Sequence, residues 1–399
     1  RSYFDSGVLE ETSAAGGAWR VNLEKLGTVR LPMSVEEAVA LRISTLSKTE
    51  RRVLEHAAAM GAVFWLGGLV ALERMDAEPP ELWQSSVRKE IERLEAVLDE
   101  LVERDYLLRL DDGVFPDEPE FVFKHNFERE KLIALTSAAR SRRYHQTIAD
   151  WLAQQTSARS QEEYMSRLAY HLEQAGSMTR AGFAYLEAGD LARRGFALRN
   201  ASEAFEKGLT LLGDDDARRR IDALHNYGDV LTLLGKTDEA MASFRQMLGI
   251  AYSMNLEGKG GAAHNRMGRL YRETGSLDLA GRHLQAAREL FLLAGDQRGV
   301  AASHDDIGKL LWVRGDYDEA LREMRTALDM RREQGDRRSI ALSLNNIGLV
   351  WMDHGRPANA KEALEASLQI RREINDPVGV ADSLNTLGSL NVDQNQFEA

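Results

Sequence analysis

The sequence predicts an all-α fold in which an α-solenoid of paired helices follows a smaller helical module with one β-hairpin. The main observation is a set of five glycines spaced forty residues apart, at Gly228, Gly268, Gly308, Gly348 and Gly388. A glycine seven residues later and an alanine five residues after that keep the same period, at Gly235, Gly275, Gly315 and Gly355 and at Ala240, Ala280, Ala320 and Ala360. A period of this length is typical of a repeat array, whose neighbouring units share one core.

Each repeat contains two stretches of helical periodicity separated by a glycine. In the repeat at 301–340, apolar residues recur at spacings of three and four on both stretches. Asp316 is the predicted N-cap of the second helix, and Glu319 is predicted to complete a capping box. Gly308 and Ala320 are predicted at the crossing of the two helices, because a larger side chain there would push them apart.

The residues before the repeats predict a separate module. Ser34 is a predicted N-cap, and Ser47 with Glu50 predicts a capping box at the start of the next helix. A weak strand-like piece is expected at Trp19–Leu23. Helices are predicted at 34–46, 47–60, 64–75 and 83–104.

Two strands are then predicted at Tyr106–Leu110 and Glu120–Lys124, around the turn signal Asp112-Gly113. Further helices are predicted at 126–135 and 137–156. Helices followed by a hairpin and another helix predict a winged-helix-like domain over 33–125. A helical connector is expected over 126–180, and the repeat array over 181–399.

Composition limits the classes of function. The chain has a net charge of −12, which disfavours a nucleic-acid or anionic-membrane partner, and it has no cysteine, which excludes disulfides and fits a cytoplasmic location. The longest apolar run, Ala62–Leu72, is too short to span a bilayer, and no signal peptide is present. The chain starts at Arg1, and its last repeat stops after one helix and a turn. We therefore expect it to be a piece of a longer protein.

The repeat pattern resembles a forty-residue form of the tetratricopeptide repeat known from peptide-binding adaptors. The small positions of that family match Gly348 and Ala360, and its large apolar positions match Leu344, Ile347, Trp351 and Leu364. The resemblance covers about 221–399. A degenerate first repeat is expected at 181–212, where Phe196 stands in place of the glycine between the helices, and the last repeat is truncated.

Residues 31–212 are similar to the segment that follows the ATPase core in bacterial STAND-type signalling ATPases. The matching stretches are LPMSVEEAVALRISTLSKTERRVLEHAAAMGAVF at 31–64, FVFKHNFEREKL at 121–132, RSRRYHQTIADWL at 140–152 and LAYHLEQAGSMTRAGFAYLEAGDLA at 168–192. The resemblance implies that 1–32 is a remnant of the preceding ATPase or lid region. It also implies that the parent protein binds ATP or ADP through a core outside this chain.

His125 matches the histidine of a Met-His-Asp motif in related switch ATPases, with Lys124 and Asn126 beside it. The resemblance implies that His125 senses the β-phosphate of ADP. The alternative is a histidine that caps the next helix or packs under the wing.

No catalytic constellation is present in the sequence. The Gly235-Lys236-Thr237 stretch has Val230 where a phosphate loop requires its first glycine, and the histidines show no metal-binding spacing. We therefore expect no enzyme activity, metal or cofactor in this chain. The long helix at 83–104 carries more acidic than basic residues, which disfavours DNA binding.

In tetratricopeptide arrays the first helix of each pair lines a concave groove. The stripe that this geometry implies begins with His225, Asp229 and Thr232. It continues with the candidate partner-binding residues Asn265, Arg269, Arg272, Asp305, Lys309, Trp312, Asn345 and Asn385. Asparagine can grip a peptide backbone, Trp312 offers an apolar anchor, and Arg269, Arg272 and Lys309 can hold a carboxylate. The alternative is that the asparagines bond within the array and the charges are simply solvated.

Three functions follow in order of preference. The first is a regulatory and sensory segment of a signalling ATPase, in which the array binds a protein or peptide and controls the nucleotide switch of the absent core. The second is a stand-alone adaptor that joins two proteins. The third is a DNA-binding transcription regulator.

Overall fold

The computed structural model describes residues 9–11, 19–22, 34–77, 83–110, 115, 118–155, 162–213 and 216–393 of the chain. These residues belong to two compact units, Arg1–Leu191 and Ala192–Ala399, and each is considered by itself. The predicted turn at Asp112-Gly113 lies outside the described residues.

The N-terminal unit begins with strands β1 (Leu9–Glu11) and β2 (Trp19–Val21), which pair antiparallel. Its first helices have the predicted caps. The Ser34 hydroxyl accepts from the Glu37 amide before α3 (Val35–Ser44), and Ser47 and Glu50 form a reciprocal capping box before α4 (Lys48–Met60). The unit continues with helices α5 (Leu66–Glu73), α6 (Trp83–Glu103), α7 (Asn126–Leu135), α8 (Ala138–Gln154), α9 (Glu162–Gln174) and α10 (Met178–Arg194).

Three strands form a sheet in the order β3-β5-β4, with both pairings antiparallel. The predicted hairpin is confirmed as β4 (Leu107–Leu110) and β5 (Glu120–Phe123). The prediction of helix from residue 64 was wrong at its start, because Val63–Trp65 forms β3 and the helix begins at Leu66. The register places Trp65 opposite Glu120, and the buried Trp65 Nε1 donates to the Glu120 carboxylate at 2.9 Å.

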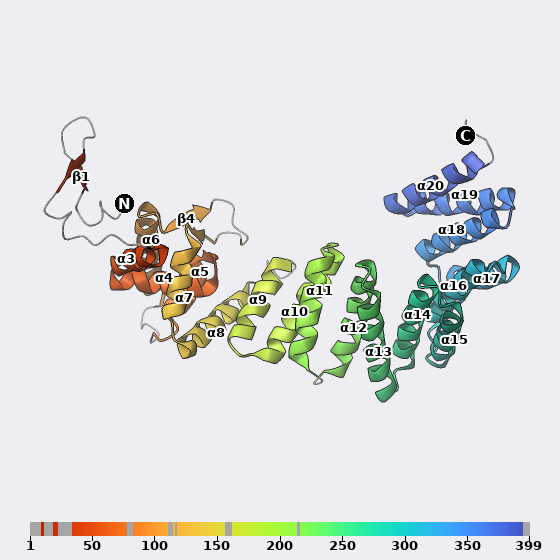
Figure 1. The fold of residues 1–399 in the computed structure, drawn as a ribbon, viewed down its shortest axis with the longest axis horizontal. Coiled ribbons are helices and arrows are strands. Elements are labelled where there is room, and N and C mark those ends of the chain that lie inside the picture. Colours follow the sequence, from red (N-terminus) through yellow and green to blue (C-terminus); the bar gives the residue numbers. More distant parts are fainter. Residues whose placement is uncertain are drawn as a thin grey trace. The chain divides into compact units, whose positions relative to one another are not determined.

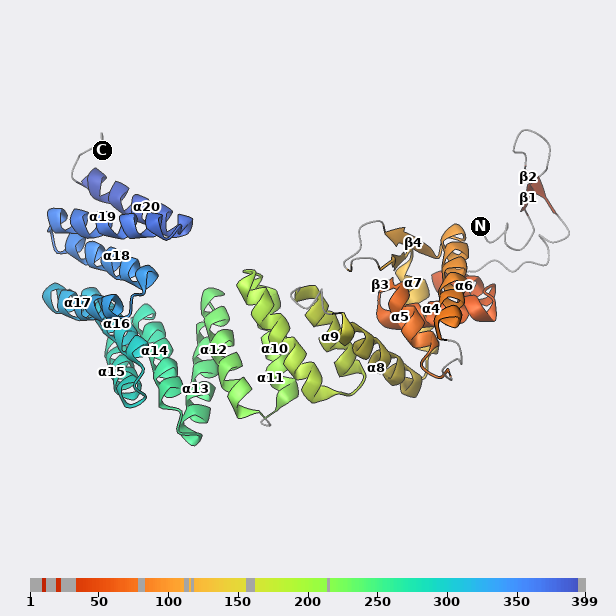
Figure 2. The ribbon, with the colours of Figure 1, turned by 180° about the vertical axis from the view of Figure 1, so that it is seen from behind.

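Within the C-terminal unit the helices follow one another side by side in both views (Figures 1 and 2). The C-terminal unit contains helices α11 (Leu198–Leu212), α12 (Ala217–Leu233), α13 (Thr237–Ser253), α14 (Glu257–Glu273), α15 (Leu277–Leu293), α16 (Gln297–Arg314), α17 (Tyr317–Glu333), α18 (Arg337–Asp353), α19 (Pro357–Glu373) and α20 (Pro377–Asp393). Each even-numbered helix from α12 to α18 is the first helix of a forty-residue repeat. The all-α fold with stacked repeats is therefore confirmed.

The periodic glycines mark the crossing of the two helices in a repeat. A Cβ atom at Gly228, Gly268, Gly308 or Gly348 would lie 2.4–2.7 Å from a side chain of the following helix, which is too close for a real contact. The periodic alanines, such as Ala320, are fully buried. Gly388 differs, since a Cβ there meets nothing within 4 Å.

The turn between the paired helices has a left-handed residue at the position of the second glycine series. Gly315 has φ 86°, and the next amide, of Asp316, donates to the Leu311 carbonyl at 3.0 Å. This bond closes the preceding helix in the manner of a Schellman motif. Asp316 is the N-cap of α17 as predicted, but its side chain makes no cap hydrogen bond, so the predicted capping box with Glu319 was wrong.

Phe196 occupies the same turn position in the degenerate first repeat. Its φ is 60°, a left-handed conformation that costs energy for a residue with a Cβ, and its ring is 84% exposed. The following amide, of Ala197, still donates to Ala192 at 2.9 Å. The turn geometry is thus kept without the glycine that favours it.

Candidate partner-binding face of the repeats

The predicted binding residues lie on the first helices of successive repeats, on what we call the first-helix face. Asn265, Arg269 and Arg272 belong to α14, whereas Asp305, Lys309 and Trp312 belong to α16. Asn345 belongs to α18 and Asn385 to α20. The structure brings the three α14 residues, Asp305 and Lys309 into one polar network.

The network centres on Asp306, a residue that the sequence did not single out. Its carboxylate is 1% exposed and accepts hydrogen bonds from Asn265 Nδ2 at 3.0 Å and from Arg269 Nε at 2.7 Å. Arg272 Nη1 lies 3.7 Å from the same carboxylate. Burial opposes ionisation of Asp306, but the charges of Arg269 and Lys309 outweigh it and hold its pKa below the usual range.

The neighbouring residue Asp305 is also buried, and its carboxylate is the centre of a second group of polar contacts. Lys309 Nζ lies 2.8 Å from the Asp305 carboxylate, and Arg331 of α17 lies 3.5 Å from it. Asn346 of α18 also donates to Asp305, at 3.5 Å. The two buried aspartates therefore pair with four cations: Arg269, Arg272, Lys309 and Arg331.

The polar contacts repeat from one first helix to the next. Asn265–Asp306, Asp305–Asn346 and Trp312–Asp353 join residues separated by 41 positions, whereas Asp229–Arg266 and Arg269–Asp306 are separated by 37. Separations close to one repeat place each pair at the same level on adjacent first helices. These pairs hold neighbouring repeats in register.

Placement in this network changes what the predicted residues can do. Asn265 is buried and bonded within the array, and Arg269 and Arg272 are paired with Asp306. Replacing both arginines by glutamate would put three carboxylates together, so this double change would perturb stability as well as binding. The Asp306 carboxylate holds the Arg269 and Arg272 side chains in place.

The remaining predicted residues differ in accessibility. Trp312 is half-buried against the core, and its Nε1 donates to Asp353 at 2.8 Å. Asn345 is buried, and its Oδ1, which is out of contact with solvent, has no hydrogen-bond donor among the described residues. Asn385 is exposed on α20.

A pocket with a volume of about 290 Å³ opens between α12 and α14 on the same face. The predicted stripe residues Asp229, Thr232 and Arg269 line it together with Arg266 and the 67% exposed Leu233. Arg266 holds Asp229 in a two-pronged pair at 2.6 and 3.0 Å. The pocket combines fixed charges with an exposed apolar side chain, which is the usual composition of a binding site.

His125 lies apart from this face, in the N-terminal unit. It is exposed at the N-cap position of α7, but its side chain makes no cap hydrogen bond. The side chains on either side of it already have partners. Lys124 forms an ion pair with Asp105 at 2.8 Å, and Asn126 accepts a hydrogen bond from Arg129 at 2.8 Å. The role of His125 in nucleotide sensing stays a prediction.

Within the described ranges, no helix has the length and apolar character needed to cross a membrane, and no cluster of three or more metal-ligating side chains occurs.

Comparison with known families identifies the repeats. Three tetratricopeptide repeat models match, at residues 221–253, 261–333 and 340–377. The resemblance is thereby confirmed for these residues, which form tetratricopeptide repeats. Such repeats form a scaffold for protein–protein interaction.

Solved structures with related shapes include the BtubC protein of P. vanneervenii, at 21% identity and a TM-score of 0.44 over 56% of this chain and 92% of that one. A STAND protein with a tetratricopeptide repeat sensor from Pyrococcus horikoshii is 12% identical, with a TM-score of 0.45 over 92% of this chain and 63% of that one. A Rap protein complexed with competence and sporulation factor is 14% identical, with a TM-score of 0.46 over 82% and 88%. At these scores the likenesses carry no argument about function. No curated protein sequence matches the chain.

Proposed function

We propose that the array binds a protein or peptide segment on the first-helix face, at the pocket between α12 and α14. The observation that carries the proposal is the convergence of Asp229, Thr232 and Arg269 on one pocket, because these residues were selected from repeat geometry alone. Leu233 supplies exposed apolar surface at its edge. An extended segment that places an apolar side chain against Leu233 fits this site.

Pre-organisation favours binding at this site. Arg266 and Arg269 are each fixed by an aspartate of a neighbouring helix, so little side-chain entropy is lost when a partner arrives.

A peptide-display selection on the immobilised chain tests the proposal. Selected peptides are measured by fluorescence anisotropy against the wild type, Leu233→Asp and Leu293→Asp. Leu293 is a matched control, since it is also an exposed leucine at the last position of a helix, but it lies on the second helix α15. We expect Leu233→Asp to weaken binding at least tenfold and Leu293→Asp to leave it within twofold. Equal loss in both variants, or no enriched peptide, would refute the site.

The finer proposal is that this binding regulates a STAND-type signalling ATPase. The N-terminal unit has the order helix, strand, helix, helix and hairpin in α4, β3, α5, α6 and β4–β5, which is the order of a winged helix. That module would contact an ATP- or ADP-binding core outside this chain, with the exposed His125 available to a phosphate. An inducer that prefers the open state would then shift the population toward it. The chain itself would act by binding and not by catalysis.

Two outcomes separate this proposal from the adaptor alternative. A signalling ATPase requires a phosphate-loop motif elsewhere in the gene product, and in that protein His125→Ala should speed the release of bound ADP. A gene product with no such motif would instead favour the adaptor. The DNA-binding alternative is disfavoured because Arg88 of α6 and Arg104, the residue directly after this helix, are paired with Glu92 and Glu50.

A further inference from the structure

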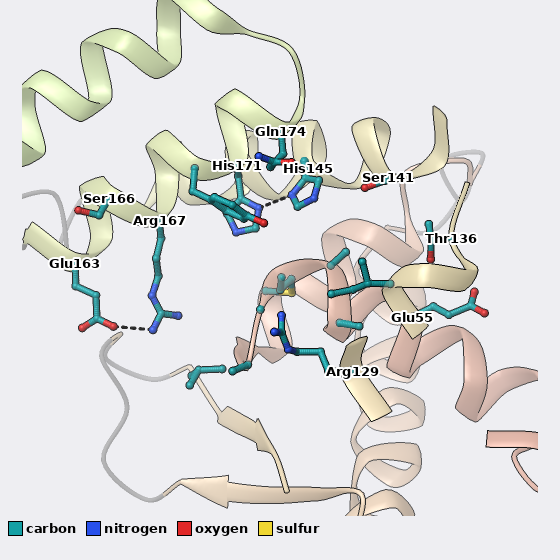
Figure 3. Close-up of a pocket in the computed structure, with 18 residues that line it drawn as sticks. Glu55, Arg129, Thr136, Ser141, His145, Glu163, Ser166, Arg167, His171 and Gln174 are labelled. Atoms are coloured by element: carbon teal, nitrogen blue, oxygen red, sulfur yellow. Dashed lines mark hydrogen bonds and ion pairs between the residues drawn. The ribbon is translucent and has the colours of Figure 1, made fainter. Parts of the chain in front are cut away.

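A second pocket, with a volume of about 480 Å³, lies within the N-terminal unit between α4, β3, α7, α8 and α9 (Figure 3). Its apolar wall comes mainly from the end of α4 and the start of β3, with Ala58, Ala59, Met60, Ala62 and Val63. Polar side chains of α4, α7, α8 and α9 line the rest of the pocket. A pocket of this size that combines an apolar wall with fixed polar groups is typical of a small-molecule site.

Two buried histidines form one wall of the pocket. His145 of α8 and His171 of α9 join their Nδ1 atoms at 2.8 Å, and the residues are 8% and 2% exposed. Burial lowers their pKa values to about 4 and about 3, so both rings are neutral at physiological pH.

The hydrogen bonds determine which ring nitrogen carries each proton. The Met60 backbone carbonyl raises the pKa of His171, and because a carbonyl can only accept, the His171 proton lies on the nitrogen that faces Met60. His171 Nδ1 must then accept from the Nδ1 proton of His145. The remaining nitrogen of His145, Nε2, has no proton and no hydrogen-bond partner among the described residues. It is an unpartnered acceptor in the wall of the pocket.

Among the charged residues that line the pocket, the Arg129 guanidinium group has no acidic partner that the structure describes. Arg167 pairs with Glu163 at 2.6 Å, and Glu55 pairs with Arg51 at 3.0 Å. Arg129 of α7 bonds only the Asn126 side-chain oxygen through Nε at 2.8 Å, and it forms no ion pair in the described part of the chain. Figure 3 shows its guanidinium group extending into the space below the histidine pair.

We propose that this pocket binds a small hydroxycarboxylic acid. The ligand carboxylate would accept two hydrogen bonds from the Arg129 guanidinium group, a geometry that this group favours. The ligand hydroxyl would donate to His145 Nε2, and the hydrocarbon body would lie against the apolar wall formed by Ala58 and Met60. One unpaired cation, one unpaired acceptor and an apolar wall together select a monoanion with a hydroxyl group.

Isothermal titration calorimetry at pH 7.5 tests the proposal with 4-hydroxybenzoate as an aromatic probe and 3-hydroxydecanoate as an aliphatic one. We expect at least one to bind with a Kd below about 1 mM, the range in which specific small-ligand binding is measurable. Benzoate and decanoate, which lack the hydroxyl, and 4-hydroxybenzamide, which lacks the charge, should bind more weakly than their parents.

The variant Arg129→Gln should weaken binding of the acid at least tenfold. Lys131→Gln is the matched control, because Lys131 is an exposed cation of the same helix that does not line the pocket. Binding should be unchanged in this control. Failure of both probes to bind, equal affinity in the two variants, or a preference for inorganic phosphate would overturn the proposal. None of these outcomes depends on peptide binding by the repeats.

Discussion

Removal of the Asp306 carboxylate should destabilise the array more than any other single change on the first-helix face. Asp306 is buried and receives hydrogen bonds from Asn265 and Arg269, with Arg272 close by. In Asp306→Ala these donors lose their acceptor, while the arginine charges stay in place. The cost therefore arises from groups left without a partner as well as from the bond that is lost.

The magnitude follows from the burial of the groups involved. Breaking a buried ion pair costs about 3–5 kcal/mol, and the lower end applies here because the Arg269 side chain is 34% exposed. We expect about 3 kcal/mol for Asp306→Ala. Asp229→Ala is the matched control, since Asp229 pairs with Arg266 in similar geometry but is 35% exposed. This pair should contribute about 1 kcal/mol or less.

Urea unfolding followed by circular dichroism gives the free energies of the wild type and both variants. Repeat arrays can unfold in parts, so hydrogen exchange of the α14 and α16 amides provides the local measurement. Faster exchange in these helices is expected for Asp306→Ala alone. Equal losses of stability in Asp306→Ala and Asp229→Ala, or no change in either, would contradict this role of the Asp306 carboxylate.

Three further predictions follow. Because burial lowers the pKa values of His145 and His171 from 6.5 to about 4 and about 3, only the unfolded chain takes up these protons as pH falls below 6.5. Stability should fall by up to about 1.4 kcal/mol per pH unit for each histidine between about pH 6 and 4, and His145→Asn with His171→Asn should flatten the slope measured by urea unfolding. Phe196→Gly should raise stability by about 0.5–1 kcal/mol, because it relieves the left-handed backbone; an unchanged or lower thermal midpoint would contradict this. Gly268→Ala should lower the thermal midpoint, since the added Cβ would lie 2.7 Å from Leu284, whereas Gly388→Ala, with open space, should not.

The repeat architecture could be predicted because it depends on local and periodic features. A glycine every forty residues marks each helix crossing, and the glycine of the second series marks each turn. The one turn without this glycine could also be located from the sequence. Phe196 occupies that position and adopts the same left-handed conformation. Each of these positions admits only a small or left-handed residue, so the glycines can be recognised in the sequence alone.

Strand β3 could not be predicted because its cause is not local. The run from Ala62 to Leu72 is uniformly apolar, so it has no period that separates strand from helix. Val63–Trp65 becomes a strand because β5, over fifty residues away in the chain, supplies its hydrogen-bonding edge. Tertiary pairing therefore decides this segment.

The polar network was missed for a related reason. Asp306 was not selected, although its separations of 41 and 37 residues from Asn265 and Arg269 lie close to the repeat length. Scanning for opposite charges near one repeat apart would have found it. The His145–His171 contact between α8 and α9 leaves no such signal, because those helices lie outside the regular period.

Photo-crosslinking of a selected peptide tests the central claim, that the first-helix face of the array is its binding surface. A benzophenone amino acid is placed at Leu233 in one variant and at Leu293 in another, and the crosslinked products are identified by mass spectrometry. We predict that the peptide crosslinks to position 233 and not to position 293. Equal crosslinking at both positions, or crosslinking at 293 alone, would contradict the account.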